Sequence, residues 1–301
     1  MPDFCIVGSS TLLQKSLPHF LSLFPKQVLA VFLQLESDTE AIKLCKEHGL
    51  QYFDISELKY GNTELLQKYQ ADYLFNINST LILSPEQLSI SRIANLNLHP
   101  GKLPEYAGMH THQWAIRNGE TQFGVTLHYM QAGIDTGNIA LQSVFEITEK
   151  ETGLSLFLKC MQQGATLVRE ALDIIATGSS LPSISQNHSH RKLYTQRMAQ
   201  EAYIDLQDTA DQALRLIRAA DYAPFKSPTY TPLLKLSNHT LQCVKAIRAE
   251  NPPSFDGPFF YIPEQGLYIA FSDSVILATR ILDEQGQKIP SEILNQWITA
   301  S

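Results

Sequence analysis

Short apolar runs alternate with helix-like segments through the first hundred residues, and this alternation constrains the fold more than any other feature. The apolar runs, which we expect to form strands, cover residues 4–7, 28–33, 51–55, 73–77 and 93–99. The intervening segments have helical character at residues 12–24, 39–48, 62–69 and 85–89. Strands separated by helices of this length predict an α/β fold with a doubly wound, mostly parallel sheet.

The rest of the chain predicts an extension of this domain and then a smaller one. We expect a helix at 112–118, strands at 123–129 and 139–147, and a long amphipathic helix at 152–175. Short strands with Gly and Pro turns follow at 259–262, 266–270 and 275–281, which is typical of a small barrel-like domain. The predicted division is a first domain at 1–187, a polar linker at 188–202 and a β-rich domain at 203–301.

Composition narrows the class of protein. The 301 residues are enough for two domains, and the formal net charge of −7 disfavours a protein that grips DNA or tRNA. Four cysteines lie far apart, which predicts reduced thiols rather than a disulfide framework or a zinc site. The sequence has no apolar run long enough for a bilayer and no signal peptide at its start, so we expect a cytoplasmic protein with no membrane contact.

The segment Asn97-Leu98-His99-Pro100, together with Asp135 in a glycine-bracketed loop, predicts chemistry at a carbonyl group. Alternate residues of a strand share a face, so Asn97 and His99 would point into one cleft at the carboxyl end of the strand. A side-chain amide and a charged imidazole can stabilise an oxyanion, and a nearby carboxylate can hold the imidazole charged and help a proton leave.

Four segments resemble the folate-dependent formyltransferases, a family that includes methionyl-tRNA formyltransferases, amino-sugar formyltransferases and the formylation domains of some peptide synthetases. They are NLHP at 97–100, LPEYAG at 103–108, WAIRNGETQFGVT at 114–126 and GIDTGNI at 133–139. The close resemblance covers roughly residues 70–178, and the order of the four segments is specific. It implies a Rossmann-like formyltransferase domain and 10-formyltetrahydrofolate as formyl donor, with no metal.

The resemblance also implies roles for individual residues. The implied catalytic set is Asn97, His99 and Asp135. The residues implied to line the folate site are Ser79, Thr80, Leu81, Ile82, Leu83, His128, Gly133 and Ile134. The residues expected to border the acceptor are Tyr106, Gly108, His110 and His112.

Departures from the family pattern bear on the acceptor. No arginine precedes Gly108, where many tRNA and sugar formyltransferases have one, and no long basic insertion interrupts the first half of the chain. We therefore expect a small or carrier-tethered primary amine, such as an amino-sugar nucleotide or an aminoacyl thioester, rather than tRNA. The C-terminal region from about residue 203 would border the cleft or make a subunit contact, which leaves a homodimer open.

Other functions remain open at this stage. A methionyl-tRNA formyltransferase-like enzyme is one. A 10-formyltetrahydrofolate hydrolase is another, although the first strand begins at Phe4 and leaves no room for the regulatory domain that such hydrolases usually carry at the N-terminus. His110 and His112 have a spacing seen in metal sites, which is a weaker argument for a metal-dependent hydrolase. A non-catalytic folate-binding protein would not need the Asn97, His99 and Asp135 set.

Overall fold

The computed structural model describes residues 1–8, 10–196 and 202–299, and these fall into two compact units. The first unit comprises Met1–Gly108, Phe123–Phe145 and Leu158–Leu193, and the second comprises Met109–Gln122, Glu146–Phe157 and Tyr194–Ser301. Residues 197–201 of the expected linker and residues 300–301 of the expected C-terminal domain lie outside the described residues.

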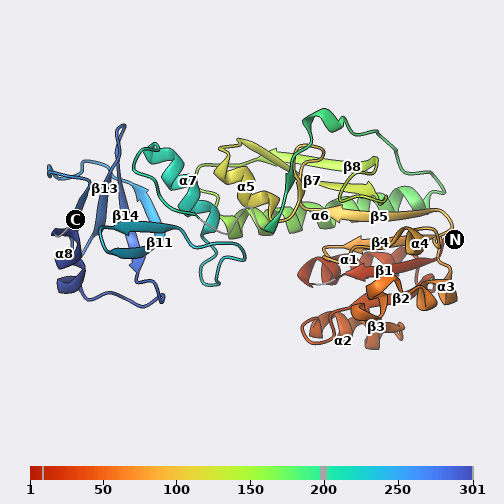
Figure 1. The fold of residues 1–301 in the computed structure, drawn as a ribbon. Helices are drawn as coiled ribbons and strands as arrows, with labels where there is room; N and C mark the ends of the chain where they lie inside the picture. Colours follow the sequence, from red (N-terminus) through yellow and green to blue (C-terminus); the bar gives the residue numbers. More distant parts are fainter. Residues whose placement is uncertain (9, 197–201, 300–301) are drawn as a thin grey trace. The chain divides into compact units, whose positions relative to one another are not determined.

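A single sheet organises the first unit (Figure 1). Among the described residues it has seven strands in the order β3-β2-β1-β4-β5-β7-β8. Its members are β1 (Phe4–Gly8), β2 (Val28–Leu33), β3 (Tyr52–Asp54), β4 (Tyr73–Ile77), β5 (Ala94–His99), β7 (Gln122–Tyr129) and β8 (Ile139–Glu146). The first five strands pair in parallel, and β7 runs antiparallel to β5. The predicted mostly parallel, doubly wound sheet is confirmed.

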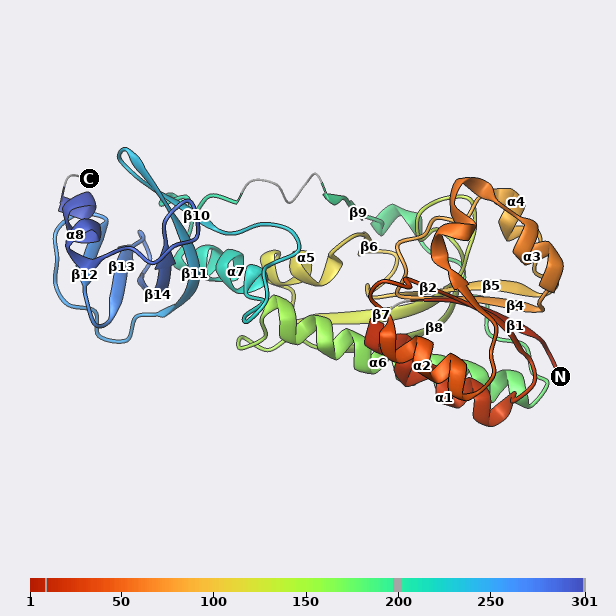
Figure 2. The same ribbon diagram turned by 90° about the horizontal axis from the view of Figure 1, so that it is seen from below.

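Helices cover both faces of this sheet (Figure 2). One face carries α1 (Ser10–Leu23), α2 (Thr39–Glu47) and α6 (Gly153–Ala176), and the other carries α3 (Glu64–Tyr69) and α4 (Pro85–Leu88). A 3₁₀ segment at Ile55–Gly61 precedes α3, and another at His188–His190 precedes the short strand β9 (Leu193–Tyr194), which pairs with β6 (Ala107–Gly108). No helix in the described part of the chain is long and apolar enough to cross a membrane.

Each face of the sheet has its own apolar core. On the α1 side, Phe4 packs edge-on against Phe20 and stacks on Tyr73. On the α3 and α4 side, a second cluster contains Val7, Phe32, Leu58, Leu66 and Leu83. Strands buried on both faces read as continuous apolar runs, which is why the first strands were recognisable in the sequence.

The second unit contains a smaller sheet with its own core. Its described part has five strands in the order β10-β11-β14-β13-β12, all paired antiparallel. Its elements are α5 (Thr111–Arg117), α7 (Ala210–Ala220), β10 (Leu233–Leu236), β11 (His239–Arg248), β12 (Phe259–Ile262), β13 (Gly266–Ala270), β14 (Val275–Leu282) and α8 (Ser291–Thr299). Apolar residues of α7 and α8 pack on this sheet, and the predicted β-rich C-terminal domain is confirmed.

Candidate active site

The register of three adjacent strands brings polar side chains together at the carboxyl end of β5. Asn97 of β5 is paired with Asn76 of β4 on one side and with His128 of β7 on the other. Paired residues on adjacent strands point to the same face, so these three side chains form a row across the sheet. The neighbouring Leu96 and Leu98 point to the opposite face, where both are buried. The strand ends at His99, directly before Pro100.

Both ring nitrogens of His99 face acceptors. Its Nε2 lies 2.7 Å from the carbonyl oxygen of Tyr106, which can only accept a hydrogen bond. Its Nδ1 lies 3.6 Å from Oδ2 of Asp135. A neutral imidazole carries one N–H, whereas the imidazolium carries two. His99 is 4% exposed, so both of its ring nitrogens lie against acceptors in a buried position.

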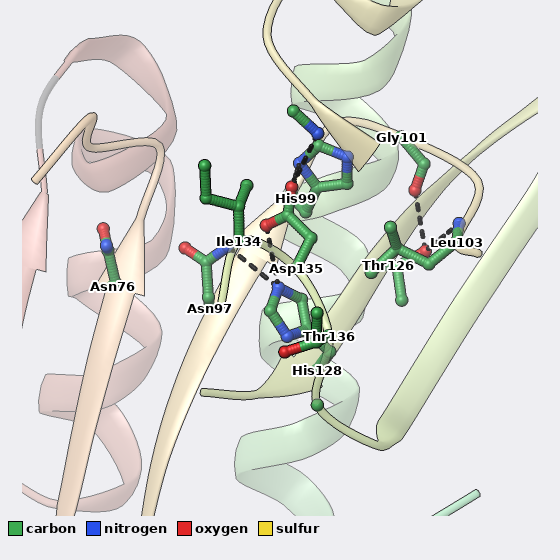
Figure 3. A network of polar contacts seen from close by, with 12 residues as sticks. Asn76, Asn97, His99, Gly101, Leu103, Thr126, His128, Ile134, Asp135 and Thr136 are labelled. Atoms are coloured by element: carbon green, nitrogen blue, oxygen red, sulfur yellow. Dashed lines mark hydrogen bonds and ion pairs between the residues drawn. The ribbon is translucent and has the colours of Figure 1, made fainter. Parts of the chain in front are cut away.

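Asp135 is the centre of this network (Figure 3). Its Oδ2 accepts a hydrogen bond from the Gly108 amide at 2.8 Å, and its Oδ1 lies 3.4 Å from Nε2 of His128. Burial alone would raise the pKa of this carboxyl group. Attraction to the neighbouring His99 ring and the hydrogen bond from the Gly108 amide outweigh burial and hold the pKa of Asp135 well below its usual range. Asp135 is therefore a carboxylate at every physiological pH.

His128 connects the carboxylate to Asn97. Its Nδ1 lies 2.9 Å from the carbonyl oxygen of Tyr129, so this nitrogen carries a proton. Its Nε2 lies 3.0 Å from the Asn97 amide nitrogen, which can donate to it. This contact fixes the rotation of the Asn97 side chain and leaves the amide oxygen of Asn97 turned away from His128.

A second polar network holds the loop after β5. The Thr126 hydroxyl, fully buried on β7, donates to the carbonyl of Gly101 at 2.7 Å and accepts from the Leu103 amide at 3.3 Å. Gln142 of β8 donates to the same hydroxyl and to the Leu103 carbonyl, each at 2.9 Å. These bonds place the Tyr106 carbonyl against His99, and the site is therefore supported by rigid strands rather than by the loop alone.

The expected folate segment follows β4 and is shaped by Asn76. The Asn76 oxygen accepts from the Ser79 amide at 3.3 Å, and its nitrogen donates to the Leu81 carbonyl at 3.4 Å. Leu83 is buried, whereas Ile82 is 76% exposed and Thr80 is exposed as well. An exposed isoleucine in an ordered loop is available to a bound ligand.

The other segment expected to line the folate site is the loop before Asp135. Gly133 and Ile134 are both exposed, and Ile134 is 45% exposed. They lie directly beside the carboxylate in sequence, and Figure 3 shows Ile134 next to Asn97 and Asp135. A ligand that contacts Ile134 would therefore reach the catalytic cluster.

The residues expected at the acceptor fall into two groups. Tyr106 and Gly108 belong to the first unit and contact His99 and Asp135 through their backbone, as described above. The Tyr106 ring is buried edge-on against Phe123. His110 and His112 belong to the second unit.

The two histidines have partners within the second unit. His110 adopts a left-handed backbone conformation, and its ring bonds to Gln196 at 2.7 Å. His112 is buried, packs against Phe157 and bonds to the Tyr222 hydroxyl. Burial, together with neighbouring His110, lowers the pKa of His112 to about 3. His112 is therefore neutral in the folded protein at physiological pH. Among residues 1–8, 10–196 and 202–299, no group of three or more His, Cys, Asp or Glu side chains is arranged to hold a metal ion.

Comparison with known proteins identifies the family. The family described as formyl transferase matches residues 23–177, about half of the chain. The chain belongs to the formyl transferase family. The resemblance seen in the sequence is thereby confirmed, as are the fold class and the expectation of a folate-dependent formyltransferase fold and enzyme class.

Two curated members of the formyl transferase family are similar to this chain. A methionyl-tRNA formyltransferase of Agathobacter rectalis is 32% identical over 187 residues, which cover 61% of this chain and 59% of that protein. A methionyl-tRNA formyltransferase of a Synechococcus species is 30% identical over 244 residues, covering 79% of this chain and 74% of that protein. The first match thus spans less than two thirds of its relative.

A solved structure shows the same fold over nearly the whole chain. The N-formyltransferase of Helicobacter canadensis, solved with folinic acid and dTDP-3-aminofucose, superposes with a TM-score of 0.71 at 20% sequence identity. The match covers 93% of this chain and 99% of the other. The likeness therefore includes the β-rich domain as well as the formyl transferase domain.

Some residues of the site could not be read from the sequence. Asn76 ends an apolar run and gives no sign of its role until β4 is paired with β5. Thr126 lies inside the segment that resembles the family, yet its role depends on Gly101 and Leu103, which are more than twenty positions away. Gln186 lies at the end of the expected first domain, and it bonds to the loop of Asp135.

Proposed function

We propose that this protein transfers the formyl group of 10-formyltetrahydrofolate to the primary amine of a small or carrier-bound acceptor. The observation that carries this proposal is the pair formed by the buried His99 and the partly buried Asp135, which lies beside the amide of Asn97 at the carboxyl end of β5. Ligands of doubly wound sheets bind outside the carboxyl ends of the strands. The pair puts a positive charge where the reaction develops a negative one.

His99 would stabilise the oxyanion of the tetrahedral intermediate. When the amine nitrogen attacks the formyl carbon, negative charge develops on the formyl oxygen. An imidazolium held on one side by the Tyr106 carbonyl and on the other by Asp135 keeps its charge without reorganisation, which is the basis of electrostatic catalysis. Removing one such stabilising group typically costs on the order of 10²–10³ in rate.

Asp135 has a supporting role that follows from its depressed pKa. A carboxylate with a low pKa is a weak base toward an ordinary ammonium group. The ammonium of the tetrahedral intermediate is more acidic, and Asp135 can relay its proton, directly or through a water, to the folate N10 as the bond between the formyl carbon and N10 breaks. The main contribution of Asp135 is to orient the His99 ring and to balance the positive charge proposed for it.

Asn97 would bind the acceptor side of the reaction. Its amide nitrogen is engaged with His128, so its oxygen is the group presented to a ligand. An amide oxygen can accept a hydrogen bond from an attacking primary amine and orient its lone pair toward the formyl carbon. The roles of Asn97 and His99 are thus complementary, one at the nucleophile and one at the electrophile.

The formyl donor would bind between residues 79–83 and the loop of Gly133 and Ile134. Asn76 orders the first segment, and Ile82 offers an exposed apolar side chain to the flat pterin ring. The solved N-formyltransferase of Helicobacter canadensis was obtained with folinic acid, the 5-formyl analogue of this donor, and its fold is the same. This supports the choice of a folate as donor.

For the acceptor we favour an amino-sugar nucleotide or an aminoacyl thioester. The net charge of −7 is unfavourable for gripping a nucleic acid. The Helicobacter canadensis protein, similar over 93% of this chain, was solved with an amino-sugar nucleotide. Methionyl-tRNA is the second candidate, because the curated relatives at 32% and 30% identity are methionyl-tRNA formyltransferases.

An acceptor panel tests this proposal. The protein would be incubated with 10-formyltetrahydrofolate carrying a labelled formyl group and, separately, with amino-sugar nucleotides, aminoacyl carrier thioesters, methionyl-tRNA and no amine. We expect the highest rate with one of the first two classes. A higher rate on methionyl-tRNA would select the second candidate, and equal folate turnover with and without amine would indicate a hydrolase.

The catalytic assignment has its own test. His99→Ala and Asp135→Asn should each lower the rate at least about tenfold, and on the order of 10²-fold if each removes one oxyanion contribution. Both variants should bind folinic acid nearly as well as the wild type, because the charge that they stabilise is absent from the ground state. Calorimetry with folinic acid and single-turnover formyl transfer separate the two effects.

A further inference from the structure

The segment at residues 184–193 follows the long helix α6 and bonds to both β8 and β6. Ile184 exchanges both backbone hydrogen bonds with Ile139 of β8, at 2.8 and 2.9 Å. At the other end, the Lys192 carbonyl accepts from the Ala107 amide at 3.0 Å. The segment is thus tied to β8, which follows the Asp135 loop, and to β6, whose Gly108 amide donates to Asp135.

Gln186 is the side chain of this segment that touches the Asp135 loop. It is 9% exposed, and its Nε2 donates to the carbonyl of Asp135 at 2.9 Å and to that of Gly137 at 2.6 Å. Both partners are acceptors, so the amide nitrogen must face them. Its own Oε1 is buried and has no hydrogen-bond partner among the described residues. Leaving a buried acceptor unpaired is unfavourable, so the hydrogen bonds to the two carbonyls decide the orientation of the Gln186 amide.

The loop needs such support because its backbone is strained. Asp135 has φ of 52°, in the left-handed region that residues with a β-carbon rarely adopt. A conformation of this kind persists when the surrounding structure holds it. Arg191 adds a third bond, from its Nη2 to the Ile134 carbonyl at 2.7 Å. Side chains from one short segment thereby hold the carbonyls of Ile134, Asp135 and Gly137.

We propose that Gln186 is a positioning residue for the formyl transfer reaction, which acts by holding the backbone of Asp135 so that its carboxylate meets His99, His128 and the Gly108 amide. Arg191 supports the same loop from Ile134. The proposal rests on the catalytic role of Asp135 proposed above. Gln186 itself touches neither donor nor acceptor in this role, so its loss should affect the rate more than the binding of substrates.

Gln186→Met tests the proposal. Methionine has nearly the same length and shape but no donor, and it also removes the unpaired buried oxygen, so the variant should fold. A displacement of about 1 Å in a catalytic group can cost on the order of 10²-fold in rate. We expect kcat to fall about 10- to 100-fold, with the KM for 10-formyltetrahydrofolate and the Kd for folinic acid changed less than about threefold. Gln162→Met, at an exposed glutamine of α6, is the matched control and should keep the wild-type rate.

A double-mutant cycle shows whether Gln186 acts through Asp135. If it does, adding Gln186→Met to Asp135→Asn should lower the rate little beyond Asp135→Asn alone, because residues that act as a unit are not additive. Multiplicative losses would overturn the proposal, and so would a Gln186→Met enzyme with wild-type kcat or one in which KM rises while kcat is unchanged. In each of these cases the wild type is active. A wild type that transfers formyl to no acceptor of the panel would instead refute the proposed function.

Discussion

Replacing Gly101 with alanine should disable the site although Asn97, His99 and Asp135 are all kept. Gly101 lies in the turn after β5, where the His99 ring and the Tyr106 carbonyl meet. A β-carbon at this position would lie 2.2 Å from Nε2 of His99 and 2.4 Å from the Tyr106 oxygen. The hydrogen bond between those two atoms, 2.7 Å long, occupies the space that the new methyl group needs.

The magnitude follows from these distances. Nonbonded carbon contacts shorter than 3.0 Å essentially do not occur, so the ring or the carbonyl must move by several tenths of an ångström or more. The move breaks the hydrogen bond between His99 and the Tyr106 carbonyl, which is worth roughly 0.5–1.5 kcal/mol. The shift of His99 should lower kcat by about 10²-fold. Overpacking of this kind typically destabilises a protein by about 1–3 kcal/mol, so the variant should still fold.

The assay combines activity with stability. Single-turnover transfer of labelled formyl would be measured for Gly101→Ala and for Lys102→Ala, a neighbouring substitution that removes a partly exposed side chain of the same turn. Urea unfolding of both variants would show whether they remain folded. The reasoning is refuted if folded Gly101→Ala keeps more than about a third of the wild-type kcat, since a displaced His99 cannot be that active.

Three further predictions use other parts of the structure. The pKa of His112 is lowered to about 3 against about 6.5 in an unfolded chain, so the stability from its neutral form is present above pH 6.5 and is lost as pH falls toward 3. His112→Gln should remove up to about 5 kcal/mol of this acid sensitivity in urea titrations. The depressed pKa of Asp135 contributes stability above about pH 4 that is lost below it, so Asp135→Asn should show a shallower fall in unfolding free energy from pH 4 downward. Asn76→Leu removes both hydrogen bonds to the segment at 79–81 and should therefore weaken folinic acid binding about tenfold, as measured by calorimetry. Unchanged affinity would argue against the donor site at residues 79–83.

Periodicity predicted the first unit better than the second. The parallel strands are buried on both faces, so their apolar runs are continuous, and each expected run in the first hundred residues is a strand. The strands of the smaller unit are half-exposed, so their apolar runs in the sequence are shorter. The strands at 259–262, 266–270 and 275–282 were recognised, whereas β10 and β11 were not separately identified and the C-terminal helix α8 was missed. The helix α8 packs against the sheet through Leu294 and Trp297, and this packing depends on the tertiary structure.

The sequence by itself determined the alternating fold and the choice of Asn97, His99 and Asp135 as the proposed reactive groups, because strand alternation and the glycine-bracketed loop are local properties. The tertiary structure decided which groups surround these three side chains. Only strand pairing sets Asn76 and His128 beside Asn97, and only chain folding places the Tyr106 carbonyl, the Gly108 amide and Gln186 around His99 and Asp135. Charge states and hydrogen-bond partners depend on distances between residues remote in sequence, and no local pattern specifies those distances.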